Sequence, residues 1–94
     1  MDGVIAIVRT DIKQGVLTEH QYEAKRFATE EEGNTMCSSK TNEKIIGFCD
    51  EKYEVLQGAA DYINHLDNEE RIGVESNLQK IIETVKEEKK EQQP

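Results

Sequence analysis

The stretch Val4-Ile5-Ala6-Ile7-Val8-Arg9 decides the fold, because it is a continuous apolar run rich in β-branched residues. Such a run favours a strand that is buried on both faces, which is the position of a central strand. A second run of this kind is Lys44-Ile45-Ile46-Gly47-Phe48-Cys49. The sequence therefore predicts a small sheet with strands near 4–9 and 44–49, the first of them at its centre.

A wide apolar face marks the segment from Glu51 to Leu66 as a helix. Two neighbouring stripes run along it at helical spacing, and together they cover about half of the circumference, more than the roughly 100° needed to lie on one sheet. Asp50 is expected to be the N-cap residue. We expect this helix to be covered both by the sheet and by another helix. The two stripes are Tyr53, Leu56, Ala60 and Ile63, and Val55, Ala59, Tyr62 and Leu66.

The covering helix is expected at about 74–90. One side of this helix carries a narrow apolar stripe, and the opposite side consists of Glu, Gln and Lys. Val74, Leu78, Ile81 and Val85 follow the 4-3-4 spacing of a two-helix seam. Two interpretations stay open: the seam packs against the 51–66 helix of the same chain, or it also forms a homodimer interface together with Val55 and Tyr62. Lys86 to Gln93 contains no apolar residue. We therefore expect one compact domain over 1–85, followed over 86–94 by a charged helix end or a disordered tail.

The segment between the two predicted strands is less regular. Thr18 and Gln21 have capping-box spacing, which favours a helix at about 18–31 that ends before Gly33. The rival interpretation is a pair of strands through residues 16–29, turned by Gly15. Residues 30–44 are polar and are expected to form a functional or disordered loop, with one more short strand near 35–38. The predicted class is α+β, with a small sheet and three helices.

Composition and charge exclude several classes of function. The net charge is −8, and residues 1–29 are neutral, so the acidic excess lies after residue 29. No clustered positive surface is evident, so binding to nucleic acid or to an anionic membrane is not expected. The apolar run near the N-terminus is too short for a secretory signal, and two cysteines do not make a disulfide framework. We expect a cytoplasmic protein.

The candidate chemistry is weak at every point. The soft metal ligands lie no closer than twelve residues apart, unlike the paired ligands of zinc sites, so no metal is predicted. Asp61 and His65 lie four apart on the 51–66 helix, where a carboxylate is able to orient an imidazole, but no nucleophile elbow accompanies them. The segment 37–41 lacks the glycines of a phosphate loop. We therefore predict no catalytic residues and no cofactor. The soft ligands are His20, Cys37, Cys49 and His65.

The function expected by exclusion is a small acidic, non-enzymatic protein-interaction or regulatory module, such as an inhibitor, adaptor or assembly subunit. Its partner is expected to be a protein, and the apolar residues of the two C-terminal helices favour a homo-oligomer. An alternative is a small-molecule or nucleotide-binding protein with a site at a subunit interface. A second alternative is a compact enzyme that uses Asp61 and His65.

Overall fold

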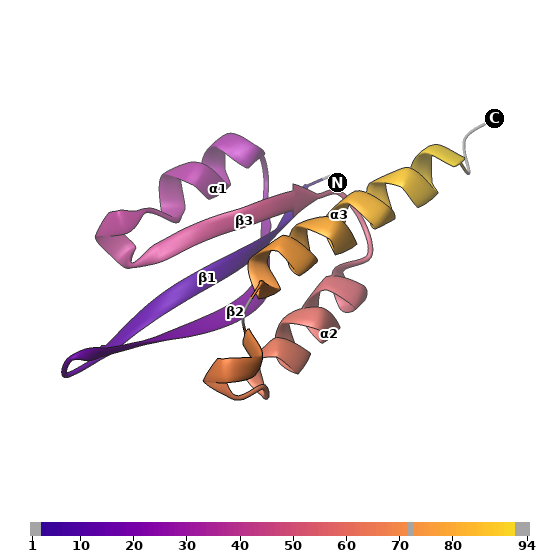
Figure 1. Cartoon of the computed structure of the whole chain (residues 1–94). Coiled ribbons are helices and arrows are strands. Elements are labelled where there is room, and N and C mark those ends of the chain that lie inside the picture. Colours follow the sequence, from indigo (N-terminus) through magenta and orange to yellow (C-terminus); the bar gives the residue numbers. More distant parts are fainter. Residues whose placement is uncertain (1–2, 72, 92–94) are drawn as a thin grey trace.

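The computed structural model describes residues 3–71 and 73–91 and has the expected α+β class. A three-stranded antiparallel sheet, in the order β2-β1-β3, lies between α1 on one face and the pair α2 and α3 on the other (Figure 1). The elements in chain order are β1 (Val4–Gln14), β2 (Leu17–Phe27), α1 (Glu30–Met36), η1 (Ser39–Thr41), β3 (Glu43–Cys49), α2 (Tyr53–Asn64), η2 (Asn68–Arg71) and α3 (Val74–Glu91).

The central position of β1 is confirmed. Ile5, Ala6, Ile7 and Val8 are all buried, although successive side chains of a strand point to opposite faces. Ile5 and Ile7 join the core beneath α2 and α3, whereas Ala6 and Val8 join a smaller cluster on the α1 face. Because both faces of this strand are apolar, the sheet requires a layer on each side.

The helix predicted at about 18–31 is wrong, because residues Leu17–Phe27 form β2 and pair with β1 over its whole length. The rival interpretation is right in part: the segment is extended and the chain turns at Gly15, but residues 16–29 contain one strand, paired with β1, instead of two. The chain reverses through Gly15 and Val16, and Gly15 has a φ of +66°, as the first central residue of a type II′ turn requires. Tyr22 and Ala24 are buried at strand spacing, and eleven residues of pairing outweigh the local capping pattern at Thr18.

The polar loop and the short strand expected over 30–44 are also wrong. Glu30–Met36 is the helix α1, and a 3-10 turn follows it. Thr29 Oγ1 accepts the Glu32 amide at 3.0 Å, while Glu32 Oε2 accepts the Ala28 amide at 2.7 Å. The first of these bonds is the N-cap bond of a capping box, whose Thr-x-x-Glu signature spans residues 29–32, but the Glu32 carboxylate bonds the amide of the residue before the N-cap.

Gly33 was predicted to follow the end of a helix. It lies instead inside α1, where it is buried. A Cβ atom at this position would stand 3.0 Å from a Phe48 ring carbon and 3.1 Å from a Phe27 ring carbon. The missing side chain therefore lets α1 approach the two aromatic rings on its face of the sheet.

A β-bulge in β3 decides which side chains face which layer. Ile7 pairs with Gly47 and Val8 with Ile45, so Ile46 is the extra residue. Beyond the bulge the alternation is reversed relative to an unbroken strand. As a result Lys44 lies beside α3, where it bonds Glu75, and Glu43 lies on the other face, where it bonds Lys25.

The two C-terminal helices match their predictions closely and form one core with the sheet. Leu56, Ala60 and Ile63 of α2 point inward, and they meet an inward stripe of α3. The N-cap of α2 is Lys52, with a φ of +64°, rather than Asp50. The last helix continues through Glu91, and residues 92–94 of the expected tail lie outside the described residues. The inward stripe of α3 is Val74, Leu78, Ile82 and Val85.

Leu78 tests this core. Its side chain is fully buried, so Leu78→Ala is expected to lower the free energy of unfolding by about 2–5 kcal/mol. Leu17→Ala is the matched control: Leu17 is 73% exposed, and the expected change is below about 0.5 kcal/mol. Urea unfolding followed by circular dichroism measures both, and equal losses would contradict this placement of the core.

Candidate functional site

The six residues predicted to form an interface are divided between the core and the surface. Val74, Leu78 and Val85 are buried within the chain, and Ile81 is partly buried against the same cluster. Val55 and Tyr62, from the second stripe of α2, are 50% and 67% exposed. Packing within the chain therefore occupies the seam of α3, while the outer face of α2 stays accessible. Self-association remains a prediction.

Asp61 and His65 lie on one face of α2 but do not form a carboxylate–imidazole pair. His65 Nδ1 lies 2.7 Å from the backbone carbonyl oxygen of Asp61. The Asp61 carboxylate instead accepts a hydrogen bond from Gln57 Nε2 at 2.8 Å. The carboxylate therefore does not orient the ring.

The sequence-predicted soft ligands are dispersed over the fold. Cys37 packs on the α1 face and Cys49 on the opposite face, and both are buried, free thiols. Burial raises the pKa of the Cys37 thiol, which favours its unreactive protonated form. Within residues 3–71 and 73–91, no group of three or more His, Cys, Asp or Glu side chains is placed to hold a metal ion.

The most exposed apolar residues lie at the end of the β1–β2 hairpin. We call residues 12–19 the arm; in Figure 1 it projects beyond all three helices. At its tip Val16 is fully exposed and Leu17 is 73% exposed. The sequence analysis missed this site because it predicted a helix from about residue 18, directly after Leu17, although Gly15 gave the turn signal.

Charged side chains hold the base of the arm. His20 Nδ1 and Asp11 Oδ1, from opposite strands, are 2.7 Å apart. Arg9 Nε lies 3.0 Å from Asp11 Oδ1 as an ion pair, without hydrogen-bond alignment, and Arg9 Nη1 donates to Glu75 Oε2 at 2.7 Å. The β1–β2 hairpin is therefore bonded to the first turn of α3 at the base of the arm.

Glu75 bonds two further side chains in addition to Arg9. Its carboxylate accepts from Lys44 Nζ at 3.3 Å and from the Tyr22 hydroxyl at 3.3 Å. Burial alone would raise the pKa of Glu75, but the hydrogen bond and charge of Arg9, with Lys44, bring it below its ordinary value. Burial, together with the negative charge of Glu75, raises the pKa of Tyr22 to about 12.

Arg71 connects the edge strand β2 to the C-terminal end of α2. Its guanidinium donates to the carbonyl oxygens of His20 at 2.6 Å, Asn64 at 2.9 Å and Leu66 at 3.1 Å. The last two carbonyls lie at the C-terminal end of α2 and just beyond it, where a cation interacts favourably with the helix dipole. One side chain thereby joins the end of α2 to the base of the arm.

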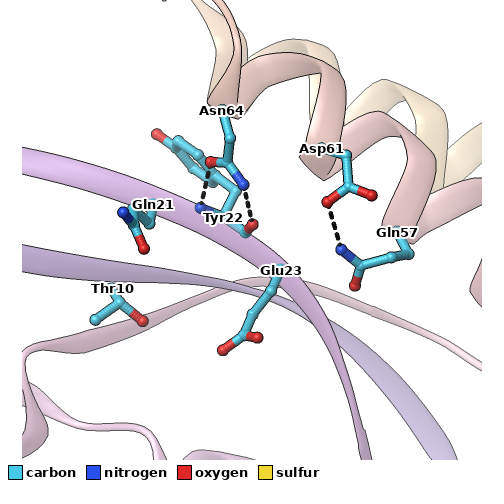
Figure 2. A pocket seen from close by; sticks show the side chains of 7 residues that line it. All are labelled: Thr10, Gln21, Tyr22, Glu23, Gln57, Asp61 and Asn64. Atoms are coloured by element: carbon cyan, nitrogen blue, oxygen red, sulfur yellow. Dashed lines mark hydrogen bonds between the residues drawn. The ribbon is translucent and has the colours of Figure 1, made fainter.

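Side-chain amides of α2 cover the outer edge of β2, and Figure 2 shows that of Asn64 bonded to the backbone of Tyr22. Asn64 accepts the Tyr22 amide at 2.8 Å and donates to the Tyr22 carbonyl at 2.7 Å, as a neighbouring strand would. Gln57 Oε1 accepts the Ala24 amide at 3.0 Å. These contacts satisfy backbone groups that an edge strand otherwise presents to other chains.

The same amides line an open polar groove of about 350 Å³ between β2 and α2. Because Gln57 and Asn64 are already bonded to the backbone of β2, they hold the two elements together instead of facing a free space. The groove therefore lies along a contact between α2 and β2 that holds the fold together. It is lined by Thr10, Gln21, Tyr22, Glu23, Gln57, Asp61 and Asn64.

Comparison of the chain with models of protein families finds no match. Comparison with curated proteins finds none either. The same holds for solved structures. Among the described residues, no helix combines the length and apolar character needed to cross a bilayer.

The lowered pKa of Glu75 predicts a pH dependence. A carboxyl group with a lower pKa in the folded state stabilises the protein above its ordinary pKa of 4.5, and this contribution is lost as the pH falls through the folded-state value. Glu75→Gln is expected to cost about 1–2 kcal/mol at pH 7 and to flatten the loss of stability below pH ~4.5.

Chemical unfolding of both proteins at several pH values between neutral and strongly acidic measures this effect. Glu83→Gln, at an exposed position of α3, is the matched control and should retain the wild-type profile. Parallel profiles for wild type and Glu75→Gln would show that the Arg9–Glu75 contact contributes nothing to folding.

Proposed function

We propose that this chain is a non-enzymatic protein-interaction or regulatory module that presents the tip of its arm to a protein partner. The observation that carries the proposal is the exposure of Val16 and Leu17 at the end of a projecting hairpin. The base of this hairpin is held by the bonds of Arg9 to Asp11 and Glu75.

The tip contributes little to the fold of its own chain. Burying an aliphatic side chain of this size is worth about 1.5–3 kcal/mol, and neither residue gains this in the isolated molecule. Two adjacent aliphatic residues on a type II′ turn therefore have more to gain from a partner than from their own core. An apolar pocket that receives two aliphatic side chains is the complementary surface.

The construction of the arm suits this role. Contacts among Arg9, Asp11, His20 and Glu75 fix the base, so that binding orders few additional backbone torsions. The arm carries one base, Lys13, and one acid, Glu19, and is therefore neutral although the chain is acidic. A neutral tip approaches a partner without the repulsion that the rest of the chain exerts on acidic surfaces.

The role of an inhibitor, adaptor or assembly subunit fits such an arm, since each acts by occupying a site on another protein. We also propose a cytoplasmic location, where a reducing environment keeps thiols such as those of Cys37 and Cys49 unpaired.

The double variant Val16→Ser/Leu17→Ser tests the proposal. It is expected to abolish capture of the partner while leaving the unfolding free energy within about 0.5 kcal/mol of wild type, because both residues are exposed. Affinity capture with tagged protein, followed by mass spectrometry, measures the loss. Met36→Ser removes a 56% exposed side chain from α1 and is the matched control, with capture expected to persist. Capture that survives the tip substitutions would refute the proposal.

A further inference from the structure

The outer edges of the sheet are protected along the body of the molecule. On β2, side chains of α2 and η2 bond outward backbone groups of residues 20–24. On β3, the bulge at Ile46 interrupts the strand, and Gln79 Nε2 donates to the Ile46 carbonyl at 3.5 Å. Covering groups and bulges of this kind keep other chains from pairing with an edge strand.

The β1 side of the arm lacks this protection. The Asp11 N–H donates to the Asn42 carbonyl at 2.8 Å, and the pairing of β1 with the β3 side ends there. Backbone groups of residues two apart in a strand point to the same side, so those of Lys13 point past the end of β3. Within residues 3–71 and 73–91, the N–H and C=O of Lys13 and the C=O of Asp11 have no hydrogen-bond partner. Three main-chain groups are therefore open along this edge.

An open groove of about 410 Å³ lies at the same edge, between the base of the arm and the start of β3. Arg9 and Lys44 bond Glu75, so their charges are already compensated. Lys13, in contrast, is exposed and has no ion-pair partner among the described residues. Its ammonium group is therefore available to an acceptor in the groove. The lining residues are Arg9, Asp11, Lys13, Asn42, Glu43 and Lys44.

These features fit an extended segment of another polypeptide. An added strand lies about 4.8 Å from its neighbour and bonds it through every second residue. Lys13 offers one donor and one acceptor, which is the pair of groups that an antiparallel neighbour bonds. In such strand addition the main-chain bonds provide affinity, and side-chain pockets provide specificity.

A second copy of the chain fits this edge poorly. A two-fold antiparallel pair centred on Lys13 sets the two ammonium groups opposite each other, and like charges in that position are destabilising. Each copy also carries a net charge of −8. The occupant is therefore a segment of a different protein.

We propose that the partner of the arm adds an extended segment to β1 at Lys13, in line with β3, and places an acceptor side chain towards the Lys13 ammonium. This rests on the proposed function, because the segment belongs to the protein that the arm binds. It specifies how that protein binds: one surface receives Val16 and Leu17, and a strand beside it pairs with β1. Lys13 and Val16 are three residues apart, about 10 Å in a strand, so one partner reaches both.

Proline substitutions on the two edges of the arm test the pairing. Lys13 and Thr18 are opposite each other in the hairpin, and their N–H groups point to opposite edges, so a proline at either position removes no bond between β1 and β2. Lys13→Pro is expected to weaken binding of the captured partner at least ~10-fold, because one main-chain bond and the ammonium are lost. Thr18→Pro is the matched control and should bind as wild type does. Lys13→Ala keeps the N–H and separates the loss of the ammonium from that of the main-chain bond. Biolayer interferometry with the purified partner measures the dissociation constants.

Hydrogen exchange measures the same pairing without a substitution. In the complex with the captured partner, the Lys13 amide is expected to exchange at least ~10-fold more slowly than in the free chain, and the Thr18 amide at an unchanged rate. An unchanged Lys13 rate, protection of Thr18 instead, or equal losses with the two proline variants overturns the proposal. If capture still depends on Val16 and Leu17 in that case, the proposed function stands. A chain that captures no partner overturns both.

Discussion

Burial of β1 on both faces is the constraint on which the rest of the structure depends. Ile5, Ala6, Ile7 and Val8 are consecutive and buried, so each face of a sheet with only three strands needs its own cover. Helices α2 and α3 cover one face, while the short α1 covers the other because Gly33 lets it approach two aromatic rings. Most of the apolar residues of the chain lie in these two layers, which makes the few large ones that remain exposed informative.

The bulge at Ile46 connects this core to the polar network. By reversing the alternation of β3, it turns Lys44 towards Glu75, which also receives Arg9 and the Tyr22 hydroxyl. The network holds the base of the arm against α3, and Arg71 fastens the same region to the end of α2. The outer edge of β2 is meanwhile satisfied by Asn64 and Gln57. The hairpin is therefore anchored where it joins the body and free at its tip.

The core and the C-terminal helices were predictable from the sequence, but the hairpin was not. The stripes of α2 and α3 repeat over several turns, so periodicity identified them, and the β-branched runs identified β1 and β3. Residues 17–27 fit a helix by local capping and alternate only weakly between polar and apolar residues, and it is their pairing with β1 that makes them a strand. The Thr-x-x-Glu capping pattern of residues 29–32 is present in the sequence, yet it was overlooked because the preceding segment was assigned to a helix. The exposure of Val16 and Leu17 could not be predicted once the hairpin itself was missed.

The sequence by itself determined the α+β class, the central buried strand and the inward stripes of the last two helices, because these depend on the order of apolar residues along the chain. Only the tertiary structure decided the hairpin, the reversal of β3 and the two exposed apolar sites on the arm and on α2. The physical reason is that exposure depends on which surfaces are covered by segments distant in sequence. The sheet and α3 cover one stripe of α2 and leave Val55 and Tyr62 accessible, and no local pattern distinguishes the two stripes.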